Sequence, residues 1–298
     1  MPDSKILLTG ATGFVGRAVI AEFARRGVKP RCLVRKNSNT TAVDSAGLEK
    51  TEGDLGDIAS LVAALEGVDT VVHSAAITGS ADPAENMRTN YEGTANLIAA
   101  CRDQGVRRAV HISTISVDLQ RRGAYGDSKL MADNAWLASG INVTLIRPTL
   151  VFGAGSRQID AIKRFVTMLP VLAPVIGDGR YKVQPVDVAD VARVVVAAAL
   201  TAMPKRLYYA AGPEQISFNE MLTRIMRRLG IKKHLVHAPY LLVMIALTAA
   251  GKVIKKLPVN AAQVSTLCQD GVCSARETEL DFGLSFTPFD RVLERVLG

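Results

Sequence analysis

The stretch KILLTGATGFVG (Lys5–Gly16) decides the fold, because an apolar strand runs directly into three glycines spaced three residues apart. Gly10 permits a tight turn, Gly13 lets the backbone approach a pyrophosphate, and Gly16 lets a following helix pack closely on the strand. The unpaired amides at the start of that helix would then face the anion. This pattern predicts a strand, a glycine turn and a helix that together cradle a dinucleotide phosphate.

Composition supports a sheet that is covered on both faces. The chain has 298 residues, of which 48% are hydrophobic and only 5% aromatic. A core built from Ala, Val, Leu and Ile suits a parallel sheet with helices on each side. The length indicates about two domains, or one large domain with an insertion.

Apolar strands alternate with helical segments through the first half, which predicts an α/β fold with a Rossmann-type, doubly wound parallel sheet. Residues 56–67 carry the signals for the start and the end of a helix, since Asp57 can cap a helix and Gly67 can end it. The expected strands are Lys5–Thr9, Arg31–Arg35, Thr70–Ser74, Ala109–Thr114 and Val143–Arg147.

After Gly153 frequent prolines break the chain into short pieces, which predicts a smaller, discontinuous C-terminal cap. A helix over 186–200 and a strand over 206–211 are apolar enough to belong to the first domain. We therefore expect a dinucleotide-binding domain over residues 1–153 plus about 181–212. The cap would take about 154–180 plus 213–298.

The chain is basic, with a formal charge of +8 and a pI of about 9.4. Its basic residues form scattered pairs without aromatic interleaving, which argues against nucleic acid and favours anionic ligands or an acidic membrane surface. Residues 240–250 are the most hydrophobic run and precede Lys252, Lys255 and Lys256. The run is too short to span a bilayer. A buried cap helix is favoured over an interfacial helix, with a weak membrane contact through 240–256 as the alternative.

The four cysteines contain no CxxC pair, so we expect reduced thiols and no metal site. Cys32 and Cys101 fall in a predicted strand and a predicted helix. The first strand starts almost at once, with no pattern of a signal peptide. We expect a cytoplasmic protein, with peripheral association at the inner membrane as the alternative. The oligomeric state stays open.

Tyr125 and Lys129 are four positions apart, which places a phenol and an ammonium on one face of a helix. A nearby Lys129 charge would lower the pKa of Tyr125 from about 10 toward neutrality, so that the phenol could exchange a proton with a carbinol oxygen. The preceding strand brings the hydroxyls of Ser113, Thr114 and Ser116 to the carboxyl edge of the sheet. One of them could hydrogen-bond the reacting oxygen.

These motifs together resemble the extended or atypical branch of the short-chain dehydrogenase/reductase superfamily, which includes NAD-dependent epimerases and dehydratases. The resemblance implies that Tyr125 is the acid/base, that Lys129 modulates its pKa and contacts the ribose, and that Thr114 is the hydroxyl partner. The matching segments are Gly10–Gly16, Asp54–Leu55, His73–Ala76, Asn90–Thr94, Tyr125–Lys129 and Arg147–Gly153.

The end of the second strand indicates the cofactor. It carries Arg35 and Lys36 and no acid that would hold a ribose 2′-hydroxyl. These cations could pair with a 2′-phosphate, so NADP(H) is favoured over NAD(H). The expected cofactor contacts are Gly10, Thr12, Gly13, Phe14, Val15, Gly16, Arg35, Lys36, Asp54, Leu55, Ser74, Ala75, Ala76, Asn90, Tyr125, Lys129, Pro148 and Val151.

We expect a small-molecule substrate, and three functions of the protein remain open. The leading one is an NADP(H)-dependent oxidoreductase that transfers hydride between nicotinamide and a carbonyl or alcohol. A nucleotide-sugar epimerase or dehydratase is second, although Val183 occupies the position where that branch carries a diphosphate-binding basic residue. The second half, especially residues 147–153, 177–186 and 211–214, also resembles bacterial relatives of the nucleotide-binding accessory subunit of complex I. That resemblance implies a nucleotide-binding scaffold or assembly protein as the third.

Overall fold

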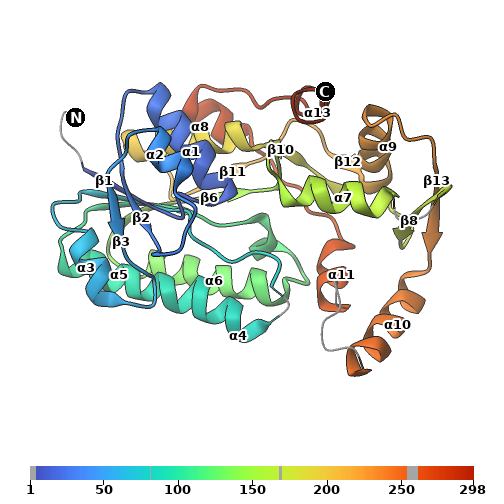
Figure 1. Cartoon of the computed structure of the whole chain (residues 1–298), viewed down its shortest axis with the longest axis horizontal. Coiled ribbons are helices and arrows are strands. Elements are labelled where there is room, and N and C mark those ends of the chain that lie inside the picture. The colour runs from blue at the N-terminus through green and yellow to red at the C-terminus, as the bar shows by residue number, and fades with distance from the viewer. Residues whose placement is uncertain (1–4, 81, 168–169, 254–260) are drawn as a thin grey trace.

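The computed structural model describes residues 5–80, 82–167, 170–253 and 261–298, and its centre is a seven-stranded parallel sheet (Figure 1). The strand order is β11-β6-β5-β4-β1-β2-β3, so the order reverses between β1 and β4. This confirms the predicted Rossmann-type α/β class. The strands are β1 (Ile6–Thr9), β2 (Arg31–Val34), β3 (Lys50–Glu52), β4 (Thr70–His73), β5 (Arg108–Ile112), β6 (Asn142–Pro148) and β11 (Leu207–Ala210).

Helices cover both faces of the sheet (Figure 1). Leu7 and Leu8 are adjacent in β1 and point to opposite faces, where each enters a separate buried cluster. The strands can therefore be apolar throughout. One face carries α1 (Phe14–Arg25), α2 (Thr41–Ser45) and α8 (Val188–Leu200), and the other carries α3 (Ile58–Ala64), α4 (Pro83–Asn86), η1 (Met87–Glu92), α5 (Gly93–Asp103) and α6 (Gly123–Leu137).

Local sequence signals set the ends of these elements. The Asp57 carboxylate accepts the amides of Ala59 and Ser60 and starts α3. The helix expected over 186–200 begins two residues later, because Asp187 caps Ala189. Val186 instead lies in β10 (Pro185–Asp187), which pairs with β7 (Leu150–Phe152).

Elements from the second half of the chain form a second lobe around Phe152, Met221 and Phe289. The domain boundaries expected from the sequence remain a prediction. In the second half, Phe282 of α12 returns to the first domain, where it packs edge-on against Tyr208 of β11. The elements not yet given are η2 (Ile115–Asp118), which follows β5, and α7 (Arg157–Thr167), β8 (Leu172–Ile176), β9 (Lys182–Val183), β12 (Ile216–Ser217), α9 (Phe218–Arg228), β13 (His234–Ala238), α10 (Tyr240–Val253), α11 (Ala261–Leu267), α12 (Arg276–Phe282) and α13 (Phe289–Leu297).

The expectation of a buried cap helix over residues 240–250 is wrong. This run forms most of α10, yet the side chains of Leu241 and Leu242 are 68% and 62% exposed. Periodicity could not reveal this, because a helix that is apolar all round gives no sign of which neighbours it lacks. Residues 254–256 of the predicted contact segment lie outside the described residues.

The cysteine thiols are free in the described structure. Cys32 and Cys101 are buried, as expected, and burial raises the pKa of each thiol to about 12. Within the described ranges, no helix combines the length and apolarity needed to cross a membrane. No cluster of three metal-ligating side chains occurs among the same residues.

Two glycines fix the approach of α1 to the sheet. Gly10 has φ +71°, and a Cβ there would overlap the backbone of Ala75 after β4. A Cβ on Gly16 would overlap the carbonyl oxygen of Gly10. The first strand, the helix and the β4 loop therefore meet where only glycine fits.

Gly16→Ala should lower the free energy of unfolding by about 1–3 kcal/mol, because the new methyl group must displace backbone atoms. Urea denaturation measures the change. Gly271→Ala is the matched control, since no atom lies within 4 Å of a Cβ at Gly271. Equal unfolding midpoints for the two variants would contradict this account of the loop.

Candidate functional site

The glycine loop presents free backbone donors at the carboxyl edge of the sheet. The amides of Phe14, Val15 and Gly16 lie in the first turn of α1, where no intrahelical acceptor exists. Gly13 at the N-cap supplies no capping side chain, and the first turn carries no acid. Gly13 is exposed and Thr12 is half-buried. This cradle fits the pyrophosphate of a dinucleotide.

Arg17 is a candidate phosphate contact that the sequence reasoning missed. Its exposed side chain lies on the first turn of α1, and Nη1 donates to the carbonyl oxygen of Thr12 at 3.3 Å. A guanidinium beside free helix amides adds positive charge where the helix dipole already favours an anion. The signal was its position directly after Gly16.

The structure places Arg35 and Lys36 immediately after β2, next to the glycine loop, because β2 pairs with β1. Both side chains are exposed, and neither forms an ion pair with another described residue. They are available to an anion at this edge. Nearby, Asp54 is exposed, although its carboxylate already accepts the Gly56 amide at 2.8 Å, and Leu55 packs beside Gly93.

The loop after β4 is tied to α6, the helix that carries Tyr125 and Lys129. Asn90 is buried, and its amide group bonds both backbone polar groups of Ile77 and the hydroxyl of Ser128. The structure thus uses Asn90 to position the loop against α6. Ser74 and Ala75 are half-buried and Ala76 is exposed in that loop. Across the sheet, Pro148 ends β6 in a buried position, and Val151 of β7 is half-buried.

Thr114 is the hydroxyl that meets Tyr125. It follows β5 and lies close enough to the phenol to influence its pKa, while its Oγ accepts the Ser116 amide at 3.1 Å and donates to the Ser116 hydroxyl at 3.2 Å. Ser113, which the sequence left as an alternative, points elsewhere: its Oγ donates to Asp133 at 2.8 Å in a buried position. The structure therefore brings together the predicted Thr114 and Tyr125.

The expected lowering of the Tyr125 pKa is wrong for this structure. Burial raises its pKa to about 12, and the charge of Asp133 adds to this, while Thr114 opposes it. Lys129 does not offset the burial because its ammonium is held elsewhere. At neutral pH the phenol therefore keeps its proton.

Lys129 lies on the same helix, one turn after Tyr125, and is fully buried. Its Nζ donates to Nε2 of His111 at 3.0 Å and to the carbonyl oxygen of Ile112 at 2.8 Å. Burial lowers the pKa of Lys129 to about 8, and the carboxylate of Asp133 opposes the fall. Burial and the Lys129 charge hold the pKa of His111 well below its ordinary value, so this imidazole is a neutral acceptor.

A buried carboxylate completes the cluster. Asp133 lies one turn beyond Lys129 and accepts Nη2 of Arg147 at 2.9 Å. Arg147 also pairs with Asp118 at 2.7 Å, and Asp118 accepts the hydroxyl of Tyr209. Sequence reasoning missed Asp133, although its spacing of four residues from Lys129 was the available signal.

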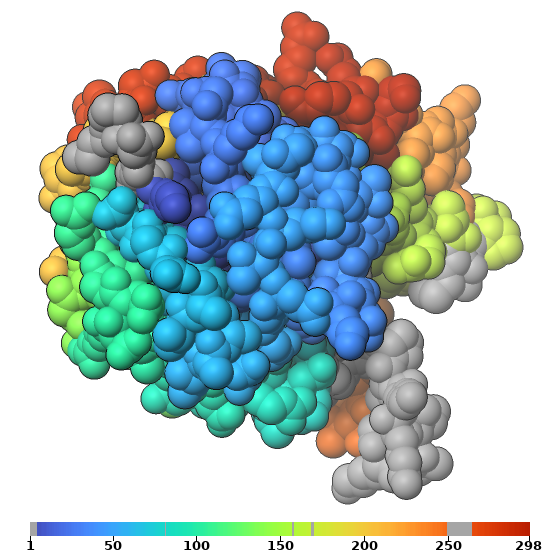
Figure 2. Space-filling model, turned by 60° about the vertical axis from the view of Figure 1, so that its left-hand side comes forward, coloured from blue at the N-terminus to red at the C-terminus, as the bar shows by residue number. Residues whose placement is uncertain are grey.

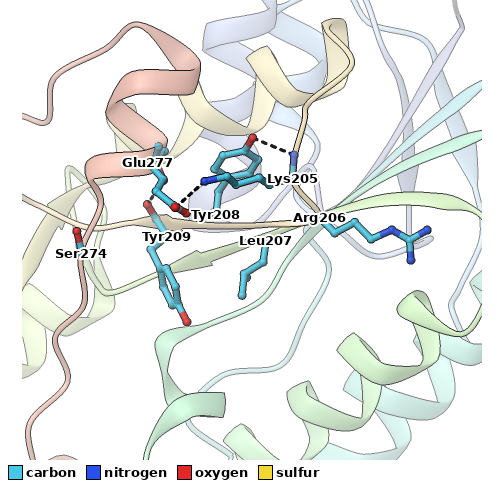
Figure 3. Close-up of a pocket in the computed structure, with 8 residues that line it drawn as sticks. Lys205, Arg206, Leu207, Tyr208, Tyr209, Ser274 and Glu277 are labelled. Atoms are coloured by element: carbon cyan, nitrogen blue, oxygen red, sulfur yellow. Dashed lines mark hydrogen bonds and ion pairs between the residues drawn. The ribbon is translucent and has the colours of Figure 1, made fainter.

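A separate hollow of about 360 Å³ lies against the edge strand β11 (Figure 3). An ion pair between Lys205 and Glu277 borders it, and the Tyr208 hydroxyl accepts the Lys205 amide. None of the residues predicted for the site lines this hollow. Ligands of open α/β sheets bind at the carboxyl edge, so the candidate site is the region between the glycine loop and Tyr125.

Sequence comparison gives relatives over most of the chain. A ketoreductase of Stigmatella aurantiaca that acts on 4-hydroxy-2-methyl-3-oxo-4-farnesyl-3,4-dihydroquinoline-1-oxide is 28% identical over 263 residues, or 79% of this chain and 76% of that protein. The 2-alkyl-3-oxoalkanoate reductase of Stenotrophomonas maltophilia is 28% identical over 261 residues, covering 76% of each chain. The proteins named here give no support to the resemblance to complex I.

The fold is also found among solved structures. The crystal structure of gox2253 superposes with a TM-score of 0.82 at 22% identity, covering 99% of this chain and 97% of that one. A family model described as the NAD dependent epimerase/dehydratase family matches residues 6–211, which hold the glycine loop, Thr114, Tyr125 and Lys129. The chain therefore belongs to the NAD-dependent epimerase/dehydratase family.

Proposed function

We propose that this protein is an NADP(H)-dependent oxidoreductase that reduces a ketone carbonyl, with Tyr125 as the proton donor. The observation that carries the proposal is a phenol that keeps its proton and lies beside Thr114, at the same sheet edge as the glycine loop. The reductase relatives support the direction of the reaction.

The chain divides the work of binding and proton transfer. The free amides of Phe14, Val15 and Gly16 hold the pyrophosphate, and Arg35 and Lys36 pair with a 2′-phosphate. The bound dinucleotide supplies the hydride. Tyr125 gives its proton to the carbonyl oxygen as negative charge develops there, and Thr114 holds the phenol in place. An alkoxide is a stronger base than a phenolate, so the proton moves downhill even from a phenol whose pKa is about 12.

Lys129 adds a buried positive charge to this site. In the described state its ammonium bonds His111 and the backbone of β5, and it does not lower the pKa of Tyr125. Because its pKa is about 8, this positive charge is lost as the pH rises through that value.

The nucleotide-sugar alternative is less well supported. Val183, at the position of the diphosphate-binding residue, packs with the apolar core of the second lobe. Its strand β9 pairs with β12, which fixes that orientation. The neighbouring Lys182 is exposed. The scaffold alternative does not account for the assembled Thr114, Tyr125 and Lys129.

Tyr125→Phe should reduce NADPH-dependent turnover of a short 2-alkyl-3-oxoalkanoate probe by about 100-fold or more, since it removes the proton donor. NADPH absorbance follows turnover, and fluorescence titration follows cofactor binding, which should be retained. Tyr208→Phe is the control, because its hydroxyl bonds Asp281 away from the site. Full turnover by Tyr125→Phe would exclude the phenol as the acid.

Arg35→Ala should weaken NADPH binding by about 10- to 100-fold and leave NADH binding unchanged, because only NADPH carries the 2′-phosphate. Parallel titrations with both nucleotides measure this ratio. Lys29→Ala removes an equal charge from an exposed position before β2, at its opposite end, and should change neither. Equal losses for NADPH and NADH in Arg35→Ala would assign Arg35 another role.

The burial of Lys129 should appear in the pH dependence of stability. Its pKa is about 8 in the folded protein and 10.5 when unperturbed. Between these values the unfolded chain binds the proton that the folded protein has lost, so stability rises with pH. The free energy of unfolding of the wild type, relative to Lys129→Met, should rise by roughly 1–3 kcal/mol between pH 8 and 10. Urea titrations test this, and a difference that does not change with pH would show that Lys129 keeps an ordinary pKa.

A further inference from the structure

Exposed apolar side chains gather on one part of the second lobe, which we call the arm and define as Val171 with β8, β13, α10 and α11. In the described part of the chain, eleven large hydrophobic side chains are exposed, and seven of them lie on the arm. A soluble surface normally scatters such residues. The seven are Val171, Leu172, Val236, Leu241, Leu242, Ile245 and Leu267.

Helix α10 carries the strongest part of this surface. Leu241, Leu242 and Ile245 are 68%, 62% and 58% exposed. Their spacing places them within about 100° of the helix circumference, so they share one side. Figure 1 shows α10 well away from the seven-stranded sheet, and in Figure 2 a few orange atoms show at the lower right, below the blue and teal helices. This side has no core to bury it.

The arm is attached to the catalytic helix through α11. Arg121, just before α6, donates to the carbonyl oxygens of Ser265 and Cys268 at 3.0 and 2.8 Å. Helix α11 in turn contacts α10. The exposed side of α10 is thus connected to the same molecular body as Tyr125.

The charge of the chain is concentrated in the sequence that builds most of this arm. Residues 221–269 contain eight Lys and Arg and no Asp or Glu, so they account for the entire net charge of +8. The other residues balance to zero. Three of the eight, Arg224, Arg227 and Arg228, lie on α9 outside the arm, and Arg224 pairs with Glu214 and Glu220. A surface that joins exposed apolar side chains to a stretch rich in lysine and free of acids complements a bilayer with anionic headgroups. Two copies meeting through their arms would oppose like charges, which disfavours a dimer there.

We propose that the arm docks on an anionic membrane surface, with Leu241, Leu242 and Ile245 entering the boundary between headgroups and acyl chains. The basic residues of 221–269 draw the arm to the surface, and the leucines and isoleucine hold it there. This docking is independent of the proposed reductase activity and needs no bound nucleotide.

Vesicle flotation of the full-length protein tests the proposal. The wild type should float with vesicles of phosphatidylcholine and phosphatidylglycerol, and far less with phosphatidylcholine alone. Raising the salt should weaken the binding, because salt screens the headgroup charge. Failure of the wild type to float with the anionic vesicles would overturn the proposal.

The combined variant L241S/L242S/I245S should bind anionic vesicles at least tenfold more weakly. Leu280→Ser is the matched control, because Leu280 is 70% exposed on α12, outside the arm, and should bind as the wild type does. Circular dichroism and thermal unfolding check that the variants fold. Equal flotation of the combined variant and the wild type would overturn the proposal. So would light scattering that shows a wild-type dimer which the combined variant cannot form.

Discussion

The candidate site depends on one buried carboxylate. Asp133 has no exposure, and it lies near the two cations that the fold has taken out of water, Lys129 and Arg147. Burial raises the pKa of this carboxyl, and the neighbouring cations oppose the rise. The negative charge of Asp133 offsets the cost of burying these two cations. Without it, Lys129 and Arg147 would be buried with an uncompensated charge. Through Ser113 it also fixes the end of β5, and so the position of Thr114.

This arrangement explains why the phenol and the ammonium have different roles. Tyr125 and Lys129 share a helix face, but the ammonium turns to His111 while the phenol turns to Thr114. Dry surroundings keep the proton on Tyr125 and ease its loss from Lys129, because burial disfavours the charged form of each. The state described here therefore suits proton donation to a carbonyl oxygen. It is the less favourable state for removing a proton from an alcohol.

Apolar side chains are exposed on the arm, whereas those of the core are buried. In the first domain, helices cover both faces of the central strands, and the Val, Leu and Ile side chains of these strands are buried. On α10 equally apolar residues remain in contact with water. Burying one such side chain is worth about 1.5–3 kcal/mol, so their exposure leaves a substantial free energy for a partner to gain. In the docking proposed above, the lysines near this helix favour an anionic surface as that partner.

The sequence alone determined the parallel α/β sheet, the glycine turn and the position of Tyr125 and Lys129 on one face of a helix. These features are local, because strand and helix periodicity, caps and glycine spacing act over a few residues. Tertiary structure alone decided the pKa of Tyr125, the partner of Lys129 and the exposure of α10. It also placed the Asp133 carboxylate where it offsets the buried charges of Lys129 and Arg147. Each depends on burial and on neighbours distant in the chain, such as His111 and Arg147, and local sequence does not encode how much water remains around a side chain.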